Sequence, residues 1–107
     1  TALGRYLLDC ALENTPRLDG AAIAWLFHSF DDVDLLSRMP DFAVPVLIVN
    51  GEHDGSLPGA LETAALIPGA VHKVIPNAGH VCNLEDPATF DRHVTEFLGG
   101  LGLMPGA

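Results

Sequence analysis

The stretch "VPVLIVNGEHD", residues 44–54, contains the strongest strand signal in the sequence. From Val44 to Val49 it is a nearly unbroken run of β-branched and aliphatic residues. A strand with one face in water would alternate between apolar and polar side chains, whereas a continuous apolar run is typical of a parallel strand covered on both faces. The stretch therefore predicts a buried strand of a parallel sheet, and the polar residues at its end predict a loop.

Three further elements are expected after this strand. A helix is predicted within residues 60–69, a second strand within 70–79 and a last helix within 86–102. Asp86 is the expected N-cap of the last helix, with Pro87 at its first position. The order strand, helix, strand predicts parallel pairing through a crossover connection. Because sheets average about five to six strands, two strands are too few, and we expect the others to come from elsewhere.

Residues 1–40 are predicted to be a helical segment. Apolar residues recur at helical spacing up to Asn14, Pro16 breaks the pattern, and a second helix is expected from Asp19 to about residue 30. This second helix carries three aromatic residues, Trp25, Phe27 and Phe30. We expect them to pack in a core or, alternatively, to line a substrate pocket. The chain has no initiating Met and no basic start, so we expect it to begin inside a longer protein.

The composition bounds the class of protein. The chain has 107 residues, of which 49% are hydrophobic and 18% charged, as is typical of a globular domain. The formal net charge is −9, with 5 Lys and Arg against 14 Asp and Glu, so nucleic acid and membrane surfaces are not expected as partners. Cys10 and Cys82 have no metal-site spacing, and with no secretory signal they favour a cytoplasmic location.

Two polar loops follow the two predicted strands. One is "GEHD", residues 51–54, and the other is "NAGH", residues 77–80. The carboxyl ends of adjacent parallel strands are where catalytic groups collect. Asp54 and His80 could pair there, since a carboxylate that accepts from one ring nitrogen fixes the tautomer and leaves the other nitrogen to act as a base. Glu52 is an alternative acid.

Other polar residues carry weaker hypotheses. His53, between Glu52 and Asp54, could be imagined in a metal site, but the spacing matches no known ligand pattern, and we expect no metal. Cys82 is poorly placed to act as a nucleophile. Three further histidines lie within predicted helices or strands and are expected to be structural or surface groups: His28, His72 and His93.

From Pro45 to Leu98 the sequence resembles the C-terminal third of an α/β-hydrolase-fold enzyme. Residues 44–54 look like that family's acid-bearing strand and loop, and residues 67–98 look like its last strand, catalytic-histidine loop and closing helix. The resemblance implies an α/β fold class, as a C-terminal fragment of an α/β-hydrolase fold with two parallel strands and flanking helices. It makes residues 1–40 the end of a cap or a helix before the acid strand, and residues 41–107 the C-terminal part of the hydrolase domain.

The resemblance also implies roles for the two loops. By carry-over, Asp54 is the triad acid and His80 is the general base. The family's nucleophile stands on a sharp turn, usually G-x-S-x-G, and none of the three serines, Ser29, Ser37 and Ser56, lies in that motif. Ser56 is better interpreted as a helix N-cap. We therefore expect the nucleophile to come from an N-terminal part of the same fold, in the same or another chain.

What the resemblance implies for function is a serine-type hydrolase of small-molecule esters or lactones that needs no cofactor. The loop "HVCNLEDP", residues 80–87, is similar to the histidine loop of enol-lactonase-like and C–C-bond hydrolases of this fold. Two alternatives stay open. One is an Asp-nucleophile hydrolase of the dehalogenase or epoxide hydrolase type, and the other is a non-catalytic binding or interaction module. This chain alone is expected to be inactive.

Overall fold

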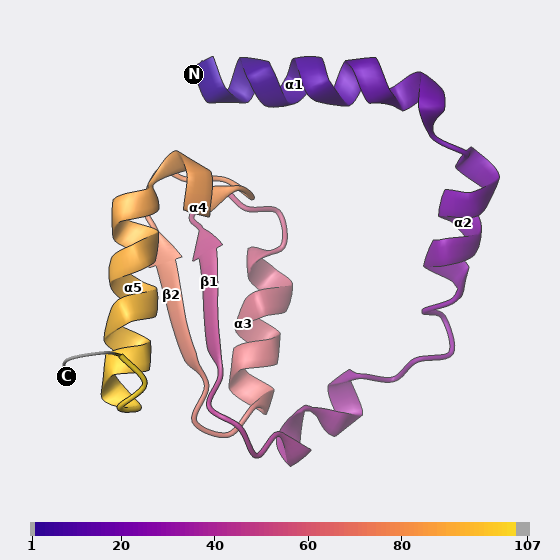
Figure 1. Ribbon diagram of the computed structural model, residues 1–107. Helices are drawn as coiled ribbons and strands as arrows, with labels where there is room; N and C mark the ends of the chain where they lie inside the picture. Colours follow the sequence, from indigo (N-terminus) through magenta and orange to yellow (C-terminus); the bar gives the residue numbers. More distant parts are fainter. Residues whose placement is uncertain (1, 105–107) are drawn as a thin grey trace. The chain divides into compact units, whose positions relative to one another are not determined.

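The computed structural model describes residues 2–104, and the chain divides into two compact units between Asp34 and Leu35. Figure 1 shows the helices and strands of both units. No helix within residues 2–104 is long and apolar enough to span a membrane. The assignment of residues 1–40 and 41–107 to different parts of a hydrolase stays a prediction.

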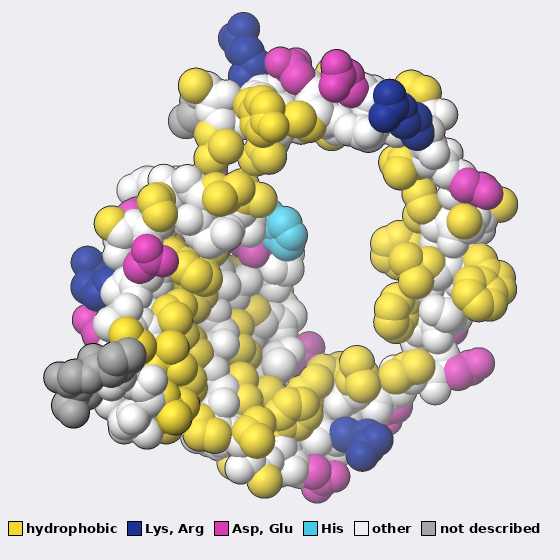
Figure 2. Space-filling model, in the orientation of Figure 1, with side chains coloured by type: hydrophobic (Ala, Val, Ile, Leu, Met, Phe, Trp, Pro, Cys, Tyr) yellow, Lys and Arg dark blue, Asp and Glu magenta, His cyan; other side chains and the backbone are white. Residues whose placement is uncertain are grey.

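The first unit consists of three helical elements: α1 (Ala2–Asn14), the 3₁₀ helix η1 (Thr15–Arg17) and α2 (Gly20–His28). The break at Pro16 and the N-cap at Asp19 are confirmed, since the Asp19 carboxylate accepts hydrogen bonds from Ala21 N and Ala22 N. Hydrophobic side chains lie at the surface of α2 (Figure 2), where Trp25 is 75% exposed and Phe27 is 70% exposed. Their expected place in a core or in a substrate pocket stays a prediction.

The second unit contains the two strands and four helical elements: η2 (Leu36–Asp41), β1 (Leu47–Gly51), α3 (Leu57–Leu66), β2 (Val71–Ile75), α4 (Cys82–Glu85) and α5 (Pro87–Gly100). β1 and β2 pair in parallel, in a register that runs from Leu47 opposite Val71 to Gly51 opposite Ile75. The predicted parallel pairing is therefore confirmed. Helices α3 and α5 pack on opposite faces of this pair (Figure 1).

The buried core of this unit is small and lies close to the carboxyl ends of the strands. Ile75, Ala78 and Cys82 are 0%, 2% and 5% exposed, and Val49 and Phe90 pack against them. The first three residues of β1 are only half-buried, although the apolar run predicts a strand covered on both faces. Among the described residues the sheet has two strands, so one edge of β1 has no neighbour to cover it.

The helix starts show what local sequence decides. Pro87 begins α5, and Asp86 is its N-cap, with its carboxylate accepting from Thr89 N at 3.1 Å, as expected. Ser56 stands at the N-cap position of α3, but the interpretation as a capping side chain is wrong, because the side chain makes no capping hydrogen bond. The short helix α4 was not expected. It forms because Leu84 N and Glu85 N both donate to Val81 O.

Candidate active site

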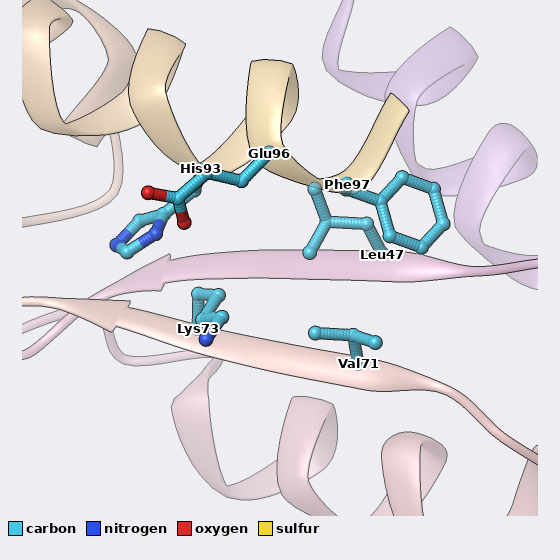
Figure 3. A pocket seen from close by; sticks show the side chains of 6 residues that line it. All are labelled: Leu47, Val71, Lys73, His93, Glu96 and Phe97. Carbon is cyan, nitrogen blue, oxygen red and sulfur yellow. The ribbon is translucent and has the colours of Figure 1, made fainter. Parts of the chain in front are cut away.

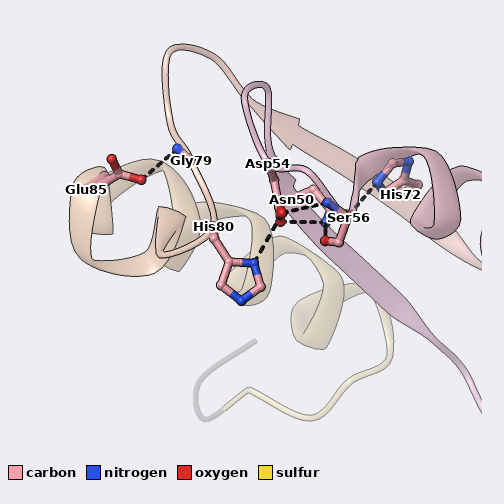
Figure 4. Close-up of polar contacts among 7 residues, drawn as sticks. All are labelled: Asn50, Asp54, Ser56, His72, Gly79, His80 and Glu85. Atoms are coloured by element: carbon pink, nitrogen blue, oxygen red, sulfur yellow. Dashed lines mark hydrogen bonds and ion pairs between the residues drawn. The ribbon is translucent and has the colours of Figure 1, made fainter. Parts of the chain in front are cut away.

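The structure brings Asp54 and His80 together from two different loops. Asp54 follows β1 and His80 follows β2, and Asp54 Oδ1 lies 3.1 Å from His80 Nδ1 (Figure 4). The Asp54 side chain is 5% exposed, whereas the His80 side chain is 83% exposed. The pair therefore has a buried carboxylate and an imidazole that faces outward.

Backbone contacts hold the two loops against each other. Glu52 N donates to Ile75 O and His53 N donates to Ala78 O, both at 2.9 Å. Gly51 permits this approach, because an ideal Cβ at position 51 would lie 2.5 Å from the Ala78 carbonyl carbon and would overlap the neighbouring carbonyl oxygens. The position of His80 relative to Asp54 is thus set by the strand ends and depends on a glycine at position 51.

Asp54 is held in its ionised form. Its Oδ1 accepts from Ser56 N at 2.9 Å, and its Oδ2 accepts from Asn50 Nδ2 at 3.1 Å. The Ser56 N–H first and the Asn50 amide second hold the pKa of the Asp54 carboxyl well below its ordinary value, against burial, which raises it. At neutral pH the group is a carboxylate, which can only accept hydrogen bonds.

The charge on Asp54 fixes the tautomer of His80. Since the carboxylate accepts, the proton of a neutral His80 ring lies on Nδ1, and Nε2 is left with a lone pair. Among residues 2–104 no group occupies His80 Nε2, which points away from Asp54 in Figure 4. The arrangement can take up a proton at Nε2 and stabilise the resulting cation.

Two polar residues on the α3 face of the sheet support this pair and were missed in the sequence. Asn50, the fourth residue of β1, is 6% exposed, and its amide contacts Asp54, Ser56 and His72. His72, expected to be a structural or surface group, lies with its Nε2 at 3.0 Å from Asn50 Oδ1. The sequence did contain one signal for such a role, namely that Asn50 is a polar residue at the end of an otherwise apolar strand.

Two carboxylates near the site act on the backbone. Glu85 Oε2 accepts from Gly79 N at 2.6 Å and so holds the residue before His80 (Figure 4). Glu52, the alternative acid, accepts from Asn77 N at 2.9 Å, where Asn77 has a φ of 56°. The Glu52 carboxylate therefore contacts a turn of the histidine loop, and Asp54 is the carboxylate that contacts the His80 ring.

The remaining candidates lie outside this pair. Ser56 Oγ accepts from Asn50 Nδ2 at 3.3 Å, and Cys82 is buried in the core. Within residues 2–104 no group of three His, Cys, Asp or Glu side chains is arranged to hold a metal ion. A hollow of about 200 Å³ lies between α5 and the sheet (Figure 3), and neither Asp54 nor His80 lines it.

Comparison with known proteins finds relatives that match part of the chain. No protein-family model matches the chain. The chain is 38% identical over 76 residues to the carboxylesterase YbfK of Bacillus subtilis, which covers 68% of this chain and 24% of that protein. Among solved structures, an enol-lactonase from Burkholderia xenovorans is 32% identical with a TM-score of 0.58, covering 64% of this chain and 27% of that one.

A third similar protein has the same pattern of partial coverage. The MenH structure from Staphylococcus aureus is 35% identical with a TM-score of 0.60, covering 64% of this chain and 26% of that one. The chain thus spans about a quarter of the length of these relatives, all of which are α/β-hydrolase enzymes. Their similarity and the parallel pair of strands between α3 and α5 confirm the expected fold class. The chain belongs to the α/β-hydrolase fold and contains the C-terminal portion of that fold.

Proposed function

We propose that this chain supplies the acid and the general base of a hydrolase that acts on small-molecule esters or lactones. The observation that carries the proposal is the contact of 3.1 Å between the buried Asp54 carboxylate and the exposed His80 ring, at the carboxyl ends of two parallel strands. Relatives named as a carboxylesterase and an enol-lactonase support this class of substrate. The chain spans a quarter of their length, so the complete protein in this proposal includes an N-terminal part of the same fold.

The reaction would follow from the two nitrogens of His80. A serine hydroxyl from the N-terminal part attacks the ester carbonyl, and His80 Nε2 takes its proton while Asp54 stabilises the imidazolium. His80 then gives that proton to the departing alcohol, or to the ring oxygen of a lactone. In the second half, His80 removes a proton from the water that attacks the acyl-serine ester, and then gives this proton to the departing serine oxygen, which releases the acid and the free serine. Backbone amides outside this chain would hold the oxyanion.

Asp54 and His80 could also serve a hydrolase whose nucleophile is an aspartate instead of a serine. With an aspartate nucleophile, His80 would only activate the water that cleaves the covalent ester, and the residue at the nucleophile turn would distinguish the two. A purely binding role gives no reason for an ionised, buried carboxylate that orients an outward-facing imidazole. The names of two relatives, a carboxylesterase and an enol-lactonase, favour ester or lactone hydrolysis. A cytoplasmic location stays a prediction from the cysteines.

The proposal is tested by turnover of p-nitrophenyl acetate in the complete protein. His80→Ala should abolish turnover and leave the melting temperature nearly unchanged, because the His80 side chain is 83% exposed. His53→Ala is the matched control, since His53 is an exposed histidine of the acid loop, and it should keep wild-type activity. Activity of His80→Ala close to that of His53→Ala would remove His80 from the mechanism.

A further inference from the structure

The Asn50 side chain has three partners, and its amide is satisfied at both ends. Nδ2 donates to Asp54 Oδ2 at 3.1 Å and to Ser56 Oγ at 3.3 Å, while Oδ1 lies 3.0 Å from His72 Nε2. The residue is 6% exposed, so water cannot readily replace a lost partner. Figure 4 shows Asn50 between Asp54 and His72.

The orientation of this amide matters for Asp54. If the Asn50 amide were rotated by half a turn, Oδ1 would face the Asp54 carboxylate, and two acceptors would meet in a buried place. The group at the other end decides between the two orientations. A donor at His72 Nε2 requires the Asn50 oxygen, and the NH₂ group must then face Asp54 and Ser56.

Strand register places His72 where it can do this. His72 pairs with Ile48, and Val74 pairs with Asn50, so His72 is the diagonal neighbour of Asn50 on the same face of the sheet. The contact links β2 to β1 before either strand ends. Asp54 and His80 form a second contact between side chains of the same two segments, after both strands end.

We propose that Asn50 and His72 are positioning residues for the reaction. His72 donates its Nε2–H to Asn50 Oδ1 and so fixes the amide in the orientation that donates to Asp54 Oδ2. With Oδ2 held by Asn50, Asp54 presents Oδ1 to His80 Nδ1. The effect on turnover rests on the proposed function, whereas the hydrogen-bond order from His72 to Asp54 can be measured without it.

The kinetic test uses p-nitrophenyl acetate and the complete protein. His72→Leu removes the donor, which frees the amide to rotate, and should lower kcat by about 10- to 100-fold with little change in KM. His72→Gln retains a side-chain N–H donor and should restore most of the activity. His53→Leu is the matched control, since it makes the same substitution at an exposed histidine of the acid loop, and it should have no effect.

Variants of the amide itself sharpen the result. Asn50→Leu should lower kcat at least as much as His72→Leu, because it removes the donor to Asp54 directly. Asn50→Asp keeps the size of the side chain but places a second carboxylate beside Asp54, and it should lower kcat further. If His72→Leu lowers the melting temperature but leaves kcat at the wild-type value, the two residues are merely structural and the inference is overturned.

A spectroscopic measurement needs no turnover. The ¹⁵N shifts of the His72 ring in the wild-type protein should show a protonated Nε2. A neutral ring with its proton on Nδ1 would overturn the inference, whatever the kinetics. If the complete protein does not hydrolyse the ester, or if His80→Ala is fully active, the proposed function fails while the His72 spectrum still decides the inference.

Discussion

Gly51→Ala should damage the active site without touching Asp54 or His80. An ideal Cβ at Gly51 would lie 2.5 Å from the Ala78 carbonyl carbon, whereas ordinary contacts begin at 3.4 Å. The three nearest atoms are backbone atoms of Ala78 and Gly79, so no side chain can turn away to make room. The histidine loop would therefore have to move by about 1 Å away from β1.

A shift of this size has two measurable consequences. Overpacking of a close backbone contact costs about 1–3 kcal/mol in the free energy of unfolding. A misplacement of about 1 Å in a catalytic group can lower the rate about 100-fold. We therefore expect Gly51→Ala to lower both the denaturant midpoint and kcat on p-nitrophenyl acetate.

Gly55→Ala is the matched control for this prediction. Gly55 lies in the same loop, directly after Asp54, and a Cβ there would meet no atom within 4 Å. This variant should keep both stability and kcat close to wild type. If Gly51→Ala and Gly55→Ala behave alike, the close approach of the two loops does not set the position of His80.

The remaining predictions concern the carboxylates of Asp54, Glu85 and Asp86. Asp54→Asn should lower kcat by roughly 10⁴-fold, as in the best-studied triad, and a loss below tenfold would move the acid role elsewhere. The folded pKa of Asp54 is lowered, so the stabilisation from its carboxylate is present above the unfolded pKa of about 3.9 and is lost as pH falls through the folded pKa. The free energy of unfolding of Asp54→Asn should therefore fall less steeply with decreasing pH than that of the wild-type protein. Glu85→Gln keeps an acceptor for Gly79 N and should retain more kcat than Glu85→Ala; equal losses would argue against this contact. Asp86→Ala should lower the melting temperature by a few degrees, whereas Asp86→Asn should keep most of it because Asn also caps helices; an unchanged Asp86→Ala would contradict the cap.

Much of the second unit could be predicted from local sequence because each element has its own signal. The apolar run before Asn50 marks β1, and Asp86 with Pro87 marks the start of α5. Topology predicted that the loops after β1 and β2 meet, since adjacent parallel strands end at the same edge, whereas the choice of Asp54 over Glu52 came from the family resemblance. These residues needed no knowledge of side-chain packing.

The supporting contacts could not be predicted because they depend on diagonal neighbours and on loop geometry. Predicting the contact of His72 with Asn50 requires knowing which residues of β1 and β2 pair, and the sequences of the two strands do not reveal this register. Ser56 stands at the expected N-cap position, yet its Oγ accepts a hydrogen bond from Asn50 Nδ2 and makes no capping contact with α3. The helix α4 has four residues and no periodic pattern to reveal it.

The most direct test of the central claim is a crystal structure of the complete protein. It should show His80 Nδ1 within hydrogen-bonding distance of Asp54 Oδ1, as in the contact of 3.1 Å described above. It should also show a nucleophile oxygen within about 3.2 Å of His80 Nε2, as a general base requires. A structure in which Asp54 and His80 are separated, or in which no hydroxyl or carboxylate approaches Nε2, would contradict the assignment of these residues as acid and base.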